Sequence, residues 1–290
     1  MINILNELFS YTFITRALLV GILVSLCASM LGVSLVLKRY SMIGDGLSHV
    51  GFGSLSIAMA LNLAPLQVSI PVVVLAAFLL LRISDSSKIK GDAAIALISS
   101  SSLAIGVIVT SLTTGMNTDV CNYLFGSILS MKHADVKLSI ALSAVVLTMF
   151  ALLYNKIFAV TFDENFAKAT GIKTDIYNML IAFLTAITIV LGMRMMGALL
   201  ISSLIIFPPL TSMRLCKSFK TVTICSAVIS VTCFFIGIVG SYIYATPTGA
   251  SVVMVNIAAF LLFWVLSFIN AKTNMISGAG ASKPDNSRRD

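Results

Sequence analysis

The sequence is poor in charged residues and lacks the motifs of several enzyme classes. Only 10% of its 290 residues are charged, whereas 58% are apolar, a balance outside that of soluble globular domains. Its five cysteines form no C-x-x-C pair, so neither a zinc knuckle nor a disulfide framework is implied. No G-x-x-x-x-G-K-[ST] phosphate loop occurs, and the two histidines are too far apart for the H-E-x-x-H of an intramembrane protease. We therefore expect a chain that is not an enzyme and does not hydrolyse ATP by itself.

Long apolar runs dominate what the sequence does contain. A helix needs about 20 mostly apolar residues to cross the hydrocarbon core of a membrane. Runs near this length recur between charged or turn-rich breaks, and they predict an all-α, polytopic transmembrane helical bundle with about eight or nine spans. The expected spans lie near residues 17–37, 43–62, 66–82, 93–113, 138–156, 176–192, 196–214, 221–243 and 250–270. One transmembrane domain over residues 1–272 is expected, followed by a polar, disordered cytoplasmic tail over 273–290.

Positive charges are distributed unevenly over the breaks between these spans. Most of them lie in alternate breaks and in the tail, near residues 38–41, 82–92, 156–175 and 214–220. Cytoplasmic loops of membrane proteins carry the excess of Lys and Arg, so we expect a multi-pass protein of the cell membrane with its N-terminus outside and its C-terminus in the cytoplasm. The net charge of +8 is not gathered into a soluble patch with interleaved aromatics. We therefore expect contact with membrane lipid and none with nucleic acid.

The stretch MIGDGLSHVGFGS, residues 42–54, begins an apolar span and yet contains an acid and a histidine. Ionisable groups inside a membrane are costly and usually mark a pathway. On a helix, Asp45 and His49 lie on one face, one turn apart, where a carboxylate oxygen and an imidazole nitrogen can share a metal ion. This ligand set suits zinc, and with more oxygen or water also manganese, whereas calcium prefers oxygen alone.

Asp45 and His49 alone are too few ligands for a tight metal site. A two-fold dimer would supply two Asp and two His if the helices met near its axis. The glycines of this stretch would let backbones approach closely, and they would also let the helix be broken. These glycines are Gly44, Gly46, Gly51 and Gly53. The simpler alternative is that Asp45 caps the start of the helix and that His49 is hydrogen-bonded to a neighbouring span.

The segment TFDENFAKATGI, residues 161–172, is polar and lies between two apolar spans on the expected cytoplasmic side. Its length allows a short helix parallel to the membrane. Asp163 and Glu164 would lie near the N-terminus of this helix, where its dipole favours negative charge, and Gly171 is placed to end it. The segment is either a docking surface for a partner or a capped loop, and the pattern alone favours the loop.

Pro208 and Pro209 interrupt the apolar stretch MMGALLISSLIIFPPLTSMRL, residues 195–215. Two prolines remove two backbone donors and favour a kink or a break in a helix. Unless nearby hydroxyls or neighbouring helices satisfy the freed carbonyls, such a break should line a cavity. The two prolines are therefore a candidate kink in a membrane pathway.

Several motifs occur in a defined order along the chain. They are SMIGDGLSHVGFGS at 41–54, GDAAIALI at 91–98, TDVCNYLFGSIL at 118–129, TFDENFAKATGI at 161–172, MMGALLISSLIIFPP at 195–209 and YATPTGASVVM at 244–254. In this order they resemble the zinc and manganese class of ABC transporter permeases, and the resemblance covers nearly the whole chain. Two positions depart from that family. Pro209 follows Pro208 where an alanine-rich run is usual, and Val50 follows His49 where alanine is commoner.

The resemblance implies the permease subunit of an ATP-driven importer of divalent metal ions. It implies a permease homodimer that works with a cytoplasmic ATP-binding subunit and with an extracytoplasmic metal-binding protein. The transported Zn²⁺ or Mn²⁺ is then cargo, and no cofactor is bound permanently. In that family the residues matching Asp45 and His49 contribute to the metal pathway, and the segment matching 161–172 docks on the ATPase. The candidate docking residues are Asp163, Glu164, Ala167 and Gly171.

Zinc is the favoured cargo, and the ligand types leave manganese open. Two other functions also remain open. A permease for a metal chelate, such as haem or a siderophore, would need a wide cavity and no direct ligation by Asp45 and His49. A passive ion channel or sensor would need no ATP-binding subunit.

Overall fold

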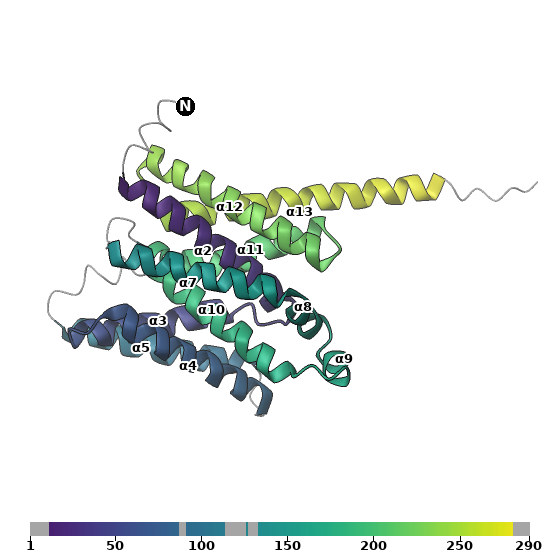
Figure 1. Ribbon diagram of the computed structural model, residues 1–290. Helices are drawn as coiled ribbons and strands as arrows, with labels where there is room; N and C mark the ends of the chain where they lie inside the picture. Colours follow the sequence, from purple (N-terminus) through teal and green to yellow (C-terminus); the bar gives the residue numbers. More distant parts are fainter. Residues whose placement is uncertain (1–11, 87–90, 114–125, 127–132, 281–290) are drawn as a thin grey trace, which may run out of the picture.

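The computed structural model describes residues 12–86, 91–113, 126 and 133–280. Every secondary-structure element in this part of the chain is a helix, and the helices form a bundle from which α13 projects (Figure 1). The helices are α2 (Thr12–Leu37), α3 (Ile43–Ala60), α4 (Pro65–Ser86), α5 (Gly91–Leu112), α7 (His133–Leu152), α8 (Tyr154–Phe162), α9 (Glu164–Ala169), α10 (Thr174–Met196), α11 (Ala198–Leu215), α12 (Phe219–Tyr244) and α13 (Thr248–Gly280). The prediction of an all-α fold is confirmed.

Eight of the described helices are long and apolar enough to cross a membrane. They are α2, α4, α5, α7, α10, α11, α12 and α13. Helix α3 matches the predicted span near 43–62, but Asp45, His49 and several glycines and serines lower its hydropathy. The predicted transmembrane bundle is confirmed, with α3 as a largely buried helix among the spans.

Helix α3 packs against α4, α5, α10 and α11, and its contact with α5 depends on glycine. A methyl group on Gly53 would lie 2.7 Å from the backbone oxygen of Ser102. One on Gly106 would lie 3.1 Å from the α-carbon of Gly53. Small residues at such contacts let helix backbones pack directly on each other. The glycines do not break α3, which is continuous over its whole length, so the expectation of a broken helix is wrong.

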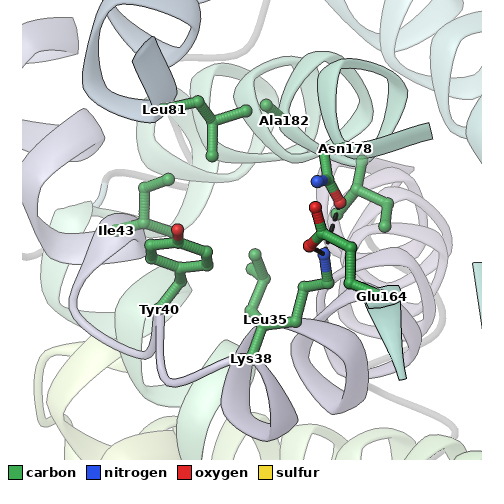
Figure 2. Close-up of a pocket in the computed structure, with 9 residues that line it drawn as sticks. Leu35, Lys38, Tyr40, Ile43, Leu81, Glu164, Asn178 and Ala182 are labelled. Atoms are coloured by element: carbon green, nitrogen blue, oxygen red, sulfur yellow. Dashed lines mark hydrogen bonds and ion pairs between the residues drawn. The ribbon is translucent and has the colours of Figure 1, made fainter. Parts of the chain in front are cut away.

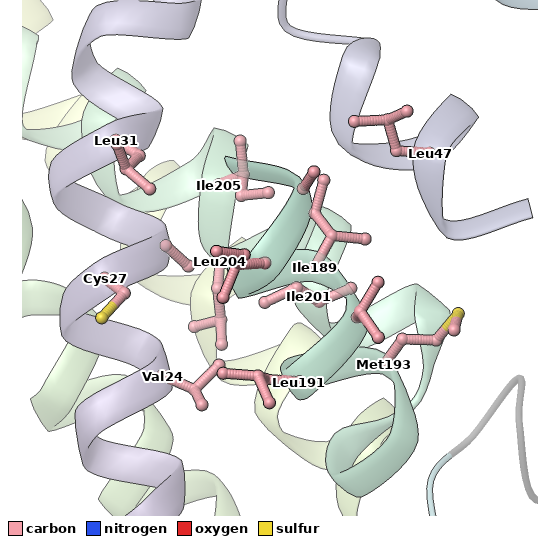
Figure 3. Packing of buried hydrophobic residues seen from close by; sticks show 14 of the residues in the cluster. Val24, Cys27, Leu31, Leu47, Ile189, Leu191, Met193, Ile201, Leu204 and Ile205 are labelled. Carbon is pink, nitrogen blue, oxygen red and sulfur yellow. The ribbon is translucent and has the colours of Figure 1, made fainter. Parts of the chain in front are cut away.

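The main apolar core lies where α2, α10 and α11 meet (Figure 3). Figure 3 shows Val24 and Leu31 of α2 gathered with Leu191 of α10 and with Leu204 and Ile205 of α11. All five side chains are buried. Because lipid is as apolar as these side chains, close packing contributes more than the hydrophobic effect to holding such helices together.

Serine hydroxyls tie α2 to α12. The hydroxyl of Ser230 donates to the backbone oxygen of Ser25 over 3.0 Å, and that of Ser226 donates to the backbone oxygen of Ser29 over 3.3 Å. Hydrogen bonds between transmembrane helices contribute about 1 kcal/mol each. The two bonds also fix how far α12 is shifted along α2, because a slip by one turn would break both.

Helix α11 runs without interruption through Pro208 and Pro209, which are both buried. Pro209 lacks the N–H that would bond to the carbonyl of Ile205. That carbonyl instead packs on Gly32 of α2, where a methyl group would lie 2.2 Å from the Ile205 oxygen. The prediction was a kink or a break. A break is absent, because a neighbouring helix accommodates the freed carbonyl, and the kink stays a prediction. A role of the two prolines in a membrane pathway stays a prediction.

Helices α8 and α9 lie at one end of the bundle, which we call the α9 end (Figure 1). The turn that joins α2 to α3 lies at the same end, because Lys38 in that turn contacts Glu164 of α9. The short helix predicted within residues 161–172 is thus present. Its neighbours are the C-terminal end of α2 and the N-terminal end of α10.

The last helix, α13, extends further than the sequence predicts. It continues through residues 273–280, which were expected to begin a disordered tail. The start of that tail at residue 273 is therefore wrong, because the backbone there remains helical. The rest of the predicted tail, 281–290, lies outside the described residues.

Candidate functional site

Asp45 and His49 lie one turn apart on α3, as their spacing predicts. Asp45 is in the first turn of the helix, and its Oδ2 atom is 3.6 Å from Nε2 of His49. The side chain of His49 is 19% exposed and that of Asp45 is 43% exposed. The carboxylate therefore reaches the surface of the single chain, while the imidazole lies mostly below it.

The two contacts that the simpler alternative predicts are not found among the described residues. The residue at the N-cap of α3 is Met42, which makes no side-chain capping hydrogen bond, so Asp45 does not cap the helix. The Nδ1 atom of His49 is buried and has no hydrogen-bond partner among the described residues. A buried polar atom left unpaired costs about 1–3 kcal/mol. The predicted hydrogen bond from Nδ1 of His49 to a neighbouring span is therefore absent from the described part of the chain, and a metal-binding role for the two residues stays a prediction.

Helix α11 places a neutral polar group beside this pair. The hydroxyl of Ser202 lies beside the Asp45 carboxylate, and it can donate there or to the backbone oxygen of Ala198 at 3.0 Å. In the described part of the chain, no three His, Cys, Asp or Glu side chains lie close enough together to hold a metal ion. Asp45 and His49 thus offer two of the about four positions that zinc fills.

Three of the four candidate docking residues build α9 itself. Asp163 caps the helix by accepting a hydrogen bond from the N–H of Phe166 over 2.9 Å. Ala167 is buried. Gly171 has a φ of +83°, and the N–H of Ile172 bonds to the carbonyl of Ala167 over 3.0 Å, a pattern that ends helices. The predicted capping by the acid and the glycine is confirmed, whereas docking stays a prediction.

The fourth residue, Glu164, points toward α2 and α10 (Figure 2). Its Oε2 atom is 3.3 Å from Nζ of Lys38, and the same Nζ donates to the side-chain oxygen of Asn178 on α10. Partial burial raises the pKa of Glu164. A hydrogen bond from Lys168, the charge of Lys38 and hydrogen bonds from Asn178 and Lys38 outweigh the burial, so the pKa lies below its usual value.

Two exposed aromatic side chains flank the acids of this segment and were not predicted. Phe162 at the end of α8 is 76% exposed, and Phe166 within α9 is 65% exposed. Neighbouring apolar side chains exposed in this way are typical of interaction sites. The sequence does carry a signal for them, namely aromatic residues inside a polar segment between two spans.

A second acid–base pair lies at the opposite end of the bundle. Asp135 is in the first turn of α7 and Arg194 is in the last turn of α10. Their Oδ2 and Nη2 atoms are 3.1 Å apart, and both side chains are mostly buried. The arginine neutralises the acid and joins two helices. No local pattern predicts this pair, because its members are far apart in the sequence.

The sequence matches a known family over most of its length. The model of the ABC 3 transport family matches residues 10–267. The manganese import system permease protein ScaB of Streptococcus gordonii is 28% identical over 263 residues, which cover 91% of this chain and 94% of that protein. The high-affinity zinc uptake system membrane protein ZnuB of Haemophilus influenzae is 28% identical over 247 residues, covering 85% of this chain and 94% of that protein. The solved structure of PsaBC from Streptococcus pneumoniae in complex with Fab matches with a TM-score of 0.82 at 28% identity, covering 91% of this chain and 95% of that chain.

Proposed function

Because this chain belongs to the ABC 3 transport family, we propose that it forms the membrane pathway of an ATP-driven importer of divalent metal ions, with zinc as the favoured cargo. The chain is a multi-pass membrane permease for metal transport. The names of similar proteins include both manganese and zinc, so the preference for zinc rests on the ligands of this chain. An imidazole nitrogen suits zinc better than it suits harder ions.

The observation that carries this proposal is the incomplete pair of Asp45 and His49. The carboxylate and the unpartnered Nδ1 atom of His49 lie on one face of a helix inside the bundle. A permease needs polar groups at such a place, because an ion that crosses the membrane must exchange its water for protein ligands. An oxygen and a nitrogen donor together fit zinc or manganese.

A homodimer would complete this site. The carboxylate of Asp45 reaches the surface of the single chain, and a carboxylate facing hydrocarbon would be costly. This favours a face that another protein surface covers. Two copies related by a two-fold axis would bring two Asp and two His together. These residues would supply the roughly four ligands of a zinc site.

The α9 end is proposed to face the cytoplasm and to bind an ATP-binding subunit. Lys38 and Lys168 lie at this end, as expected of the cytoplasmic side. Helix α9 would be the coupling helix, with Phe162 and Phe166 as its apolar contact surface. ATP hydrolysis is then the work of the partner, and this chain is not an enzyme. An extracytoplasmic metal-binding protein would deliver the ion at the opposite end of the bundle.

Metal uptake by the assembled transporter tests the pathway. Asp45→Asn and His49→Gln are each expected to lower uptake by about a hundredfold, because each removes a ligand. Zinc and manganese are offered separately, in competition, and as chelates. Matched controls are Asp175→Asn, an exposed acid on α10, and His133→Gln, the other histidine of the chain.

The outcomes separate the candidate functions. Uptake of free ions that survives both ligand substitutions would refute a pathway through Asp45 and His49. Uptake of a chelate without uptake of the free ion would favour a chelate permease. Uptake of free ions that does not depend on ATP would favour a passive channel.

Retention of the ATP-binding subunit tests the coupling helix. Phe162→Ala combined with Phe166→Ala is expected to reduce the co-purified subunit about tenfold, since exposed aromatics often dominate interface energy. The control is Phe268→Ala on α13, whose side chain is also 65% exposed. Equal retention by the double variant and the control would contradict docking at α9.

A further inference from the structure

A mostly buried lysine joins the α9 end of the bundle to the helix that carries Asp45 and His49. We propose that the Lys38–Glu164 ion pair is the link through which movement of α9 repositions α3, an inference that rests on the proposed function. Displacement of α9 by an ATP-binding subunit would then reach the metal ligands through this pair. Lys38 and Glu164 are positioning residues in this scheme and do not touch the ion.

Lys38 is held between two elements. Its side chain is only 10% exposed, whereas lysine is rarely buried unless it is paired. Its Nζ atom is 3.3 Å from Oε2 of Glu164 on α9, and it also donates to Asn178 on α10. Figure 2 shows these three side chains converging. A buried ammonium group left without its carboxylate is unfavourable, so Lys38 follows Glu164 when α9 moves.

The connection from Lys38 to α3 is short and tightly hydrogen-bonded. Arg39 takes a left-handed φ of +63°. The N–H of Tyr40 bonds back to a carbonyl of α2 over 2.8 Å, which closes that helix with a Schellman-type turn. Helix α3 begins at Ile43, whose N–H bonds to the carbonyl of Tyr40 over 3.0 Å. A shift of Lys38 therefore moves the first turn of α3, where Asp45 lies.

The structure leaves space beside this connection. A cavity of about 30 Å³ is lined by Lys38 and Glu164 together with Tyr40, Ile43 and Leu81. Figure 2 shows Lys38 and Glu164 on one side of this space and Tyr40 and Ile43 across it. A space large enough for a water molecule lets the surrounding side chains shift without overlap. The first turn of α3 thus has room to move with Lys38 relative to Leu81 of α4.

Lys168 provides a matched control, because it pairs with the other oxygen of the same carboxylate. Its Nζ atom is 3.2 Å from Oε1 of Glu164, within α9 itself, and its side chain is half-exposed. A pair inside one helix adds a little to the stability of that helix. The longer contact of Lys168 with Asp175 on α10, at 3.9 Å, also does not reach α2. Removing Lys168 therefore tests the packing of α9 without touching α2, whereas removing Lys38 tests the link.

The test measures metal imported per ATP hydrolysed by the complete transporter in lipid vesicles, with zinc ions and manganese ions as the probes. Lys38→Gln is expected to retain the ATP-binding subunit and ATP hydrolysis, because Lys38 lies outside the docking segment of residues 161–172. Metal imported per ATP is expected to fall about tenfold in this variant, since coupling between sites is lost. Lys168→Gln is expected to keep the wild-type ratio.

Charge exchange separates a link from a folding defect. Lys38→Glu combined with Glu164→Lys restores the pair with reversed sign, and Lys168→Gln is added so that the introduced lysine meets no like charge. This variant is expected to recover most of the wild-type ratio.

Three results would overturn the link: a wild-type ratio in Lys38→Gln, loss of the ATP-binding subunit from Lys38→Gln, or no recovery on charge exchange. The proposed function fails in a different way. In that case the wild-type complex itself imports no metal ion or binds no ATP-binding subunit, before any variant is compared.

Discussion

Asp135 and Asp45 each lie beside a basic side chain, yet the two pairs differ in what they can bind. Asp135 on α7 pairs with Arg194 on α10 at 3.1 Å, whereas Asp45 pairs with His49 of its own helix at 3.6 Å. Arginine carries a permanent positive charge in proteins, whereas an imidazole nitrogen can also bind a metal ion. Asp135 therefore has its counter-ion within the protein. Within the described residues, Asp45 has no permanent counter-ion beside it and is free to bind a metal ion from solution.

A structural acid and a candidate ligand differ in their partners in this membrane protein. The Asp135–Arg194 pair joins two helices and neutralises both charges. The Asp45–His49 pair joins no helices, because both residues are on α3, and it leaves Nδ1 of His49 unpaired. An ionisable group within a membrane bundle that holds no elements together is a candidate ligand.

The largest effect is expected from giving Asp45 the kind of partner that Asp135 has. His49→Arg removes a ligand and places a permanent cation beside Asp45, so an arriving divalent ion meets a neutralised carboxylate and a positive charge. Metal uptake by the reconstituted complex should fall about a hundredfold or more. Uptake close to that of wild type would show that Asp45 does not bind the ion.

The second largest effect is expected from breaking the Asp135–Arg194 ion pair. Arg194→Met leaves Asp135 charged, mostly buried and without its counter-ion, which should lower the free energy of unfolding by about 2–3 kcal/mol. The double variant Asp135→Asn/Arg194→Met removes the charge as well and should recover part of this loss. Chemical unfolding of the purified protein in detergent measures both. A single variant as stable as the double would contradict a structural role for the pair.

A smaller effect is expected from Ser202, the neutral neighbour of Asp45. Ser202→Ala removes a hydroxyl from beside the carboxylate and should weaken zinc binding about fivefold, the value of one ordinary hydrogen bond. Titration of the purified permease with zinc measures this. The matched control is Ser203→Ala, whose hydroxyl donates to the carbonyl of Leu200 over 2.9 Å. Equal changes in the two variants would rule out a specific role for Ser202.

The smallest effect concerns a third acid, Glu164, which like Asp135 has a fixed cation. Its pKa is lowered in the folded protein, so the ionised form stabilises the fold. This stabilisation is complete above the ordinary glutamate pKa of about 4.3 and is lost as the pH falls through the lower folded value. Glu164→Gln should therefore unfold at a lower temperature than wild type at neutral pH and at the same temperature in acid. A difference that does not depend on pH would contradict this.

Features that depend on neighbours in the sequence were predictable, and contacts between helices were not. The spacing of Asp45 and His49 and the capping residue of α9 follow from helix geometry alone. Lys38 and Glu164 are separated by 126 positions, and no periodicity connects residues on different helices. For the same reason the sequence did not predict that Arg194, which lies between the expected spans 176–192 and 196–214, pairs with Asp135.

Two expectations failed because a second helix compensates for a residue that weakens the first. Pro209 was expected to kink or break α11, but Gly32 of α2 leaves room for the Ile205 carbonyl that Pro209 leaves without its helical hydrogen bond. Gly53 was expected to loosen α3, but it brings α3 against the backbone of α5. Proline and glycine both weaken an isolated helix, but packing against a second helix keeps α11 and α3 continuous.

The contact at Gly53 also allows movement of the buried helix α3 to be measured from the exposed surface of α5. With no side chain between α3 and the backbone of α5 at Ser102, the two helices shift together. Helix α5 carries exposed side chains such as Leu97 and Ile108. A spin label attached at one of these positions would report a displacement of Asp45 while leaving the sequence of α3 unaltered.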